Sequence, residues 1–281
     1  MVLTSRKKKP VFALGSCRVH DPLLIAHRHG RVEYLNRRFR SRTPTYLQDV
    51  LEIVQFVRLA TGQATMPKEL GPFAFHHGLR LDRGMPGLLV EAEHFVVEIC
   101  TDKHYAAAGF VLNLNEICRQ LVDSTGAAGQ EWWLEVNRGH APNSACVATL
   151  EAVLGARLTP SHRTVLREVT FRQLSTDEIA AGLSDLKALV KRPILVMPHV
   201  TVRLPDGQFL AERLSHVEKT LAAAAMVGCP ILNPVAFIER DGQQRALDKA
   251  GTDFNHYAES YLSVVGAEIT SALRDLAYHS A

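Results

Sequence analysis

Short apolar runs alternate along the chain with longer segments in which apolar residues recur at helical spacing. Runs that predict strands lie at 11–14, 31–35, 94–100, 193–197 and 230–232. Segments with helical spacing lie between and after them, at 21–29, 46–59, 112–122, 175–190, 209–227 and 256–276. This alternation predicts an α/β fold, a three-layer α/β/α sandwich around a mostly parallel five-stranded sheet.

Capping signals set two of the helix boundaries. Ser175 followed by Glu178 is a capping box, which predicts that the helix at 175–190 begins there. Asp21 before Pro22 predicts the N-cap and the first position of the early helix.

Two segments interrupt the alternation and are predicted to be insertions in a single domain spanning residues 1–281. Residues 63–88 are rich in Gly and Pro and lack periodicity, which is typical of a loop. Residues 130–171 are ambiguous. The run from Trp132 to Val136 predicts a strand, and the remainder is either a helical insertion or a partner surface.

Composition and charge narrow the classes of function. Of the 281 residues, 47% are hydrophobic, which allows a large buried core, and the formal net charge is +3. A dedicated nucleic-acid binder would concentrate basic and aromatic residues on one face, so no nucleic-acid partner is expected. The basic cluster at 6–9 is interpreted as a solvated terminus. The cluster at 37–42 is either a surface loop or an anion-attracting rim beside the site.

The lengths of the apolar runs and the spacing of the cysteines predict where in the cell the protein resides. No run approaches the roughly 18 apolar residues of a membrane span, so no membrane partner is expected. Leu14 to Cys17 mimics a lipoprotein cleavage site, but the apolar stretch 11–14 is shorter than the roughly 7–15 residues of a signal. Five scattered cysteines without a CxxC pair suit reduced thiols, and we expect a cytoplasmic protein.

Two motifs at opposite ends of the chain carry the candidate chemistry. Gly15-Ser16-Cys17 follows the first strand, and Asp253 stands three residues before His256, ahead of the last helix. Ligands of open α/β sheets bind beyond the carboxyl ends of the strands. There His256 can activate the Ser16 hydroxyl as a base, while Asp253 orients the imidazole. Each motif also has a structural interpretation, Gly-Ser-Cys as a tight turn and Asp253 as a helix cap.

On these residues the chain resembles the SGNH/GDSL hydrolase superfamily, and within it the subgroup in which Gly-Ser-Cys replaces Gly-Asp-Ser-Leu. The resemblance implies a Ser16, His256 and Asp253 triad acting on ester bonds. It also implies an oxyanion hole made by the serine amide, a Gly after the second strand and an Asn after the third. Here Asn36 and Thr101 occupy those two places.

Further candidates surround the serine. The amides after Ser16, beginning with Cys17, face an incoming oxyanion if a helix starts there. Arg18 is either a ligand for a carboxylate or phosphate or an ordinary surface residue, and His199 is either structural or a substrate contact. No metal-ligand spacing, Walker loop or dinucleotide fingerprint is present, so neither a metal nor a cofactor is expected.

Two hypotheses follow. The first is a serine esterase or O-acyltransferase whose substrate is an ester, expected to be an acetyl ester of a carbohydrate or small metabolite. The second is a catalytically weak binding module that recognises a glycan or protein through residues 63–88 and 130–171. Whether those insertions form a lid, a contact between two copies of the chain or a docking surface is left open.

Overall fold

The computed structural model describes residues 8–39, 45–76 and 84–279. Parts of both basic clusters, at 6–7 and 40–42, therefore lie outside the described residues, as do residues 77–83 of the first predicted insertion.

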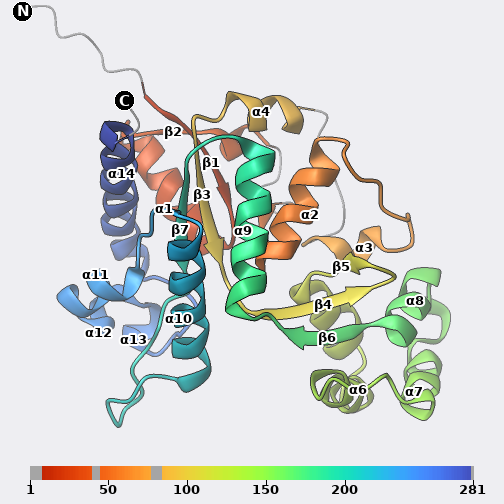
Figure 1. The fold of residues 1–281 in the computed structure, drawn as a ribbon. Coiled ribbons are helices and arrows are strands. Elements are labelled where there is room, and N and C mark those ends of the chain that lie inside the picture. Colours follow the sequence, from red (N-terminus) through yellow and green to blue (C-terminus); the bar gives the residue numbers. More distant parts are fainter. Residues whose placement is uncertain (1–7, 40–44, 77–83, 280–281) are drawn as a thin grey trace, which may run out of the picture.

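A parallel sheet forms the centre of the molecule (Figure 1). Its strands are β1 (Pro10–Leu14), β2 (Glu33–Tyr34), β3 (His94–Ile99) and β7 (Ile194–Pro198), in the order β2-β1-β3-β7. All three pairings are parallel, as the alternating pattern predicts.

The fifth strand predicted at 230–232 is reduced to an isolated parallel bridge between Ile231 and Val196. Pro230 has no amide to donate, and Asn233 already caps the next helix, α11 (Pro234–Asp241). The segment between them is therefore too short for a ladder, and the described sheet has four strands.

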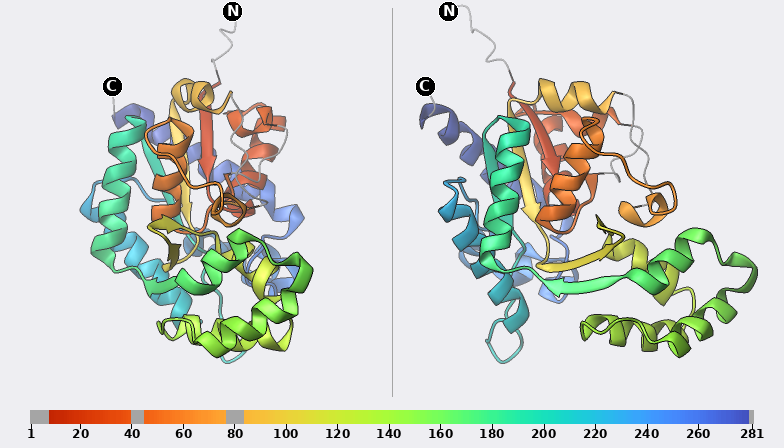
Figure 2. Two further views of the ribbon diagram at one scale, coloured as in Figure 1. Left: turned by 90° about the vertical axis from the view of Figure 1, so that its right-hand side faces the viewer. Right: turned by 45° about the vertical axis from the view of Figure 1, so that its right-hand side comes forward.

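Helices cover both faces of this sheet, because successive strand residues point to opposite sides. Phe12 and Leu14 pack towards α2 (Val50–Ala60), α9 (Thr176–Val190) and α10 (Ala211–Met226). Val11 and Ala13 pack towards α1 (Cys17–Arg28), α11 and α14 (Leu262–His279). Figure 2 shows the two helical layers from the side. The capping box of Ser175 and Glu178 begins α9 as predicted.

The helix after β1 starts earlier than predicted. Ser16 is its N-cap, and Asp21 and Pro22 lie inside α1 instead of at its start. Helix α14 crosses α1 so closely that a Cβ on Gly266 would lie 2.6 Å from the Pro22 carbonyl oxygen. The last helix starts later than predicted, after the 3₁₀ turn η5 (Glu259–Tyr261). The first and the last helix are thus packed side by side.

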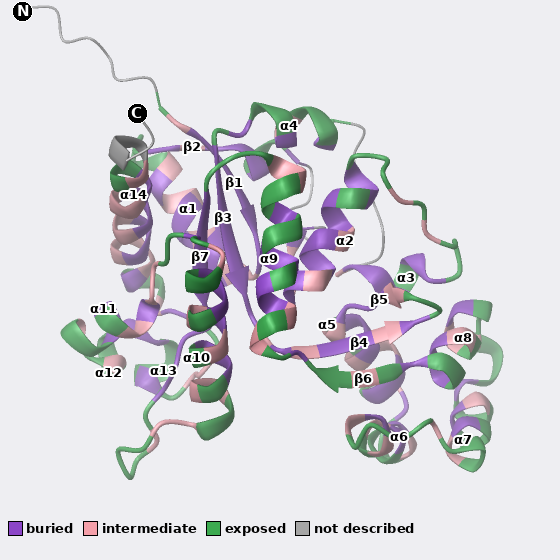
Figure 3. Cartoon of the chain, in the orientation of Figure 1, coloured by how far each residue is buried: buried purple, intermediate pink, exposed green. Residues whose placement is uncertain are grey.

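Residues 103–173 build a second, antiparallel sheet that the sequence does not predict. Its strands β4 (Lys103–Ala107), β5 (Phe110–Val111) and β6 (Thr170–Gln173) have the order β5-β4-β6. Around it lie α5 (Leu114–Ile117), the π turn η3 (Cys118–Val122), α6 (Ala127–Asn137), α7 (Ser144–Leu154), η4 (Gly155–Arg157) and α8 (Pro160–Glu168). Together with Leu70 and Phe73, these elements form a hydrophobic cluster separate from the two beside the parallel sheet. Figure 3 shows which parts of them are buried.

The strand predicted at Trp132–Val136 is wrong, because this segment lies in helix α6. Trp132 and Val136 are one helical turn apart and both are buried, whereas Leu134 between them is exposed. The loop predicted at 63–88 also contains helices, α3 (Gly71–Ala74) and the start of α4 (Met85–Glu91). The remaining short elements are η1 (Leu35–Arg38), α12 (Gln243–Ala246) and α13 (Asp248–Gly251).

Within the described ranges, no helix combines the length and apolar character needed to cross a bilayer. All five cysteines are free thiols.

Candidate active site

Ser16 lies at the carboxyl end of β1, where the chain turns into α1. Gly15 makes this turn with a φ of +146°, and a Cβ there would lie 2.6 Å from the Glu98 Cβ. Only glycine allows β1 to approach β3 so closely at this point. The half-buried Ser16 then caps α1, its Oγ accepting the Arg18 amide at 3.2 Å.

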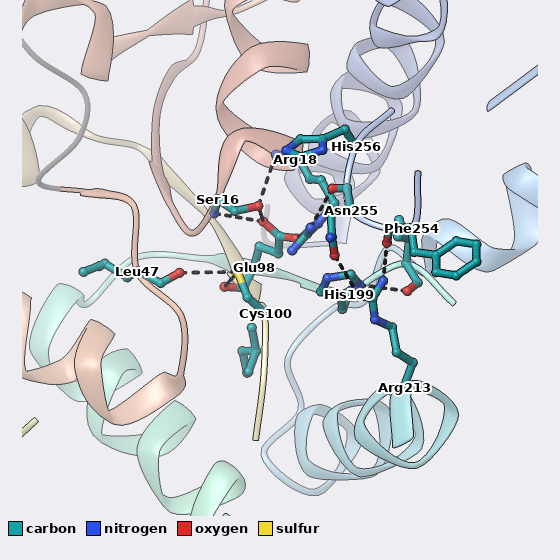
Figure 4. Close-up of polar contacts among 12 residues, drawn as sticks. Ser16, Arg18, Leu47, Glu98, Cys100, His199, Arg213, Phe254, Asn255 and His256 are labelled. Atoms are coloured by element: carbon teal, nitrogen blue, oxygen red, sulfur yellow. Dashed lines mark hydrogen bonds and ion pairs between the residues drawn. The ribbon is translucent and has the colours of Figure 1, made fainter. Parts of the chain in front are cut away.

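The Ser16 hydroxyl is held by Glu98 of β3. Ser16 Oγ donates to Glu98 Oε2 at 2.6 Å, and the Ser16 amide donates to the same oxygen at 2.9 Å (Figure 4). Glu98 is only 1% exposed. The sequence analysis missed this residue, although a single carboxylate within the apolar run at 94–100 was a signal that a buried partner was needed.

Arg18 neutralises Glu98 and extends the network to the far end of the chain. Its Nε donates to Glu98 Oε1, and its Nη1 donates to the Asn255 carbonyl oxygen at 2.8 Å. Although burial opposes the charge, Glu98 raises the pKa of Arg18 above its usual range. Arg18 is therefore buried and paired, and the alternative that it is an ordinary surface residue is wrong.

The buried pair yields a stability prediction. We expect Glu98→Gln to lower the free energy of unfolding by about 3–5 kcal/mol, because it leaves the Arg18 charge buried without a counterion. Urea denaturation measures this. The control is Asp185→Asn, which breaks the exposed pair with Arg58 and should cost no more than about 1 kcal/mol. If both variants cost the same, Glu98 and Arg18 do not hold this corner of the fold together.

Asp253 and His256 form a second pair in the loop before η5. The His256 ring Nδ1 lies 3.1 Å from Asp253 Oδ1 and 3.2 Å from Oδ2. Because an ionised carboxylate only accepts, Nδ1 carries the proton of the neutral ring and Nε2 is left as the basic nitrogen. The Asn255 amide, and then His256, hold the pKa of Asp253 below its usual value. The His256 side chain is 55% exposed.

Two arginines fix the loop that carries His256. Arg18 binds the Asn255 carbonyl, while Arg213 of α10 donates to the Phe254 carbonyl and, at 2.7 Å, to Asn255 Oδ1. Burial, and then the charge of Arg18, lowers the pKa of Arg213 to about 10. The sequence analysis did not single out Arg213, since nothing in its local sequence points to this loop.

A pocket of about 220 Å³ opens between the loop and α1. It is lined by Cys17, Arg18, Asp21, Asp248, His256, Tyr257, Glu259 and Leu262. Ser16 does not line this pocket, but the two residues that follow it, Cys17 and Arg18, do. No hydrogen bond is formed between Ser16 Oγ and the His256 ring, both of which are described, and the hydroxyl turns instead to Glu98. Figure 4 shows Ser16, Arg18 and His256 in one view, with the serine hydroxyl bound to Glu98. The triad of Ser16, His256 and Asp253 stays a prediction.

Cys17 offers a second candidate nucleophile at this pocket. Burial is the largest cause that raises the pKa of its thiol, so the reactive thiolate is scarce near neutral pH. The Ser16 hydroxyl remains the better candidate.

The other predicted site residues make contacts of their own. Asn36 is fully buried; its Oδ1 accepts the Ala13 amide at 2.8 Å, and its Nδ2 donates to the Ala13 carbonyl and to Thr45 Oγ1. Thr101 Oγ1 accepts the Lys103 amide at 3.1 Å. His199 is buried and its Nδ1 donates to the Val200 carbonyl at 2.8 Å. Burial, and then Arg18, hold the pKa of His199 well below its usual value.

These three side chains do not line the pocket. The Asn36 Nδ2 group is already engaged with the Ala13 carbonyl of β1 and with Thr45 Oγ1, so we do not assign it to an oxyanion hole. Among the residues that the structure describes, no group of three or more His, Cys, Asp or Glu side chains is placed to hold a metal ion.

The chain belongs to the TviD N-terminal domain family, whose model matches residues 10–272. A curated relative is the Vi polysaccharide biosynthesis protein TviD of Salmonella typhi, which is 24% identical over 261 residues. The alignment covers 92% of this chain and 30% of that protein, so the chain spans about a third of the relative's length. The names of the family and the relative do not mention the SGNH/GDSL superfamily, and that resemblance stays a prediction.

A solved crystal structure covers 95% of this chain and 97% of its own, with a TM-score of 0.38 and 10% identity. That likeness is too weak to define the fold.

Proposed function

We propose that this chain is a serine-dependent O-acyltransferase of the SGNH type, which transfers an acyl group such as acetyl to a hydroxyl of a carbohydrate. Ser16 is the nucleophile, His256 the base and acid, and Asp253 the carboxylate that orients the ring. The observation that carries the proposal is the contact between Asp253 and His256. Arg18 binds the Asn255 carbonyl in the same loop and also pairs with Glu98, the partner of Ser16.

The reaction requires the Ser16 hydroxyl to turn from Glu98 to His256 Nε2. The ring then takes the hydroxyl proton while Oγ bonds to the carbonyl carbon of the acyl donor. Collapse of the tetrahedral intermediate breaks the bond to the donor's leaving group, which receives the proton from His256. A carbohydrate hydroxyl repeats these steps on the acyl-serine and regenerates the enzyme.

Two features favour transfer to a carbohydrate over hydrolysis of an unrelated ester. The name of the relative refers to polysaccharide biosynthesis, a process in which new bonds are formed to sugars. The carboxylates of Asp21, Asp248 and Glu259 line the pocket, and carboxylates accept hydrogen bonds from sugar hydroxyls. We infer an acceptor with several free hydroxyls.

The second candidate is a binding module without turnover. It is favoured by the contact of the Ser16 hydroxyl with Glu98, at 2.6 Å, in place of one with His256. In that case the pocket binds a glycan and Ser16 only caps α1.

A fluorophosphonate probe separates the two candidates, because it reacts covalently with activated serines. We expect labelling of the wild-type chain and none of Ser16→Ala. Ser175→Ala is the matched control, since Ser175 is also an N-cap whose hydroxyl contacts a glutamate, Glu178, but lies outside the site. Gel fluorescence measures the label. Absence of labelling between about pH 6 and 9, where a catalytic histidine acts as base, would favour the binding module.

A further inference from the structure

The Tyr257 hydroxyl is a buried polar group without a hydrogen-bond partner in the described part of the chain. Tyr257 is 6% exposed. By contrast, Tyr34, Tyr105 and Tyr261 are equally well buried, and each hydroxyl is hydrogen-bonded, to His20, Asn137 and Asp241 respectively. Burying a hydroxyl without a partner costs about 1–3 kcal/mol, so an exception of this kind requires an explanation.

Tyr257 stands at the candidate active site. It follows His256 and lines the pocket together with Cys17 and Arg18. Burial, and then the charge of Glu98, raises the pKa of Tyr257 well above its usual range. The hydroxyl is therefore protonated near neutral pH and is available as a hydrogen-bond donor at a pocket that Cys17, the residue after Ser16, also lines.

The amide of Cys17 is a second free donor at this place. The Ser16 amide is bound to Glu98, whereas the Cys17 amide, the first in the 12-residue helix α1, has no acceptor within residues 8–39, 45–76 and 84–279. The N-terminus of a helix favours negative charge, and Tyr257 lines the same pocket as Cys17, its hydroxyl buried and unpartnered.

We propose that Tyr257 is a catalytic residue whose hydroxyl, with the Cys17 amide, stabilises the oxyanion of the acyl-transfer reaction; this rests on the function proposed above. As Ser16 Oγ bonds to the carbonyl carbon, the electron pair of the C=O double bond moves to the oxygen. Tyr257 and Cys17 donate hydrogen bonds to that oxygen without transferring a proton. When the bond to the leaving group breaks, the pair returns and the double bond re-forms.

This assignment supplies the hydrogen-bond donors for the oxyanion that the site otherwise lacks. The side chains that the SGNH resemblance places in the oxyanion hole, Asn36 and Thr101, do not line the pocket, and the Ser16 amide is bound to Glu98. A tyrosine with an unpaired hydroxyl, lining the pocket together with Cys17, can supply the preorganised donor that the developing charge requires.

Tyr257→Phe is the test, because it removes only the hydroxyl. On an aryl acetate we expect kcat to fall by about 10²–10³-fold, with a much smaller change in KM. Labelling of Ser16 by a fluorophosphonate should slow as well, since the phosphonyl oxygen occupies the same position. The melting temperature should stay level or rise, because an unpaired buried hydroxyl has been removed.

The matched control is Tyr261→Phe. Its ring lies 6.3 Å from that of Tyr257, but its hydroxyl is bound to Asp241 at 2.8 Å and to the Phe237 carbonyl at 3.0 Å. This variant should lose stability and keep kcat. If turnover depends on Ser16 and Tyr257→Phe retains kcat within twofold, the Tyr257 assignment alone is overturned. If turnover does not depend on Ser16, the proposed function fails and the assignment falls with it.

Discussion

Ser16→Ala is expected to reduce kcat for acyl transfer on the order of 10⁴- to 10⁶-fold, the loss seen when one member of a catalytic triad is removed. Without the hydroxyl no acyl-serine forms, and His256 has no proton to take from the chain. The measurement is the turnover of an aryl acetate, with and without an oligosaccharide acceptor.

The fold should survive this substitution with a moderate loss of stability. Ser16 Oγ caps the Arg18 amide at 3.2 Å, which contributes about 1 kcal/mol, and its hydrogen bond to the buried Glu98 carboxylate contributes about 1.5–3 kcal/mol. Ser175→Ala removes an equivalent cap from α9 but only an exposed contact with Glu178, so it should cost less and leave kcat unchanged. Equal activity of Ser16→Ala and wild type would rule out Ser16 as the nucleophile.

His256→Ala is expected to reduce kcat by a comparable factor, on the order of 10⁴- to 10⁶-fold, because the base and acid of both half-reactions are lost together. The His256 side chain is 55% exposed, and an exposed polar contact such as the one with Asp253 contributes at most about 1 kcal/mol. In His256→Ala, kcat should therefore fall strongly while the melting temperature changes little, and both are measured on the same sample.

His140→Ala is the control for this variant. His140 is also an exposed histidine, 63% exposed, with its Nδ1 3.3 Å from a carboxylate, that of Glu135. It should leave both kcat and the melting temperature nearly unchanged. A large loss of stability in His256→Ala would instead identify His256 as a structural residue, and the base would have to be sought elsewhere.

The sequence predicts those parts of the fold that local pattern determines. Strands β1 and β7 are continuous apolar runs and β3 is mostly apolar, as expected for strands covered on both faces, and the Ser175 capping box marks the start of α9. The proximity of Ser16 to the loop of Asp253 and His256 is also predictable. Both motifs occupy connections at the carboxyl edge of a parallel sheet.

Other elements depend on contacts that no local pattern contains. The strands of the second sheet have two to five residues, too few for a period to show. Trp132 and Trp133 suit a strand as well as a helix, and only the cluster around Trp132 decides between them.

Several residues of the candidate site likewise depend on contacts that no local sequence pattern contains. Glu98 becomes a partner of Ser16 because Gly15 allows close approach, and Arg213 reaches Asn255 from a helix some 40 positions earlier. Tyr257 is conspicuous only once its hydroxyl is found without a partner.

The central claim is that Ser16 and His256 act on the same acyl group, and a crystal structure of the fluorophosphonate adduct tests it most directly. We predict phosphorus bonded to Ser16 Oγ, with His256 Nε2 about 3 Å from an oxygen of the adduct. Tyr257 and the Cys17 amide should contact the phosphonyl oxygen. An adduct on Cys17, or Ser16 unmodified and still bound to Glu98 with the His256 ring turned to solvent, would contradict the account.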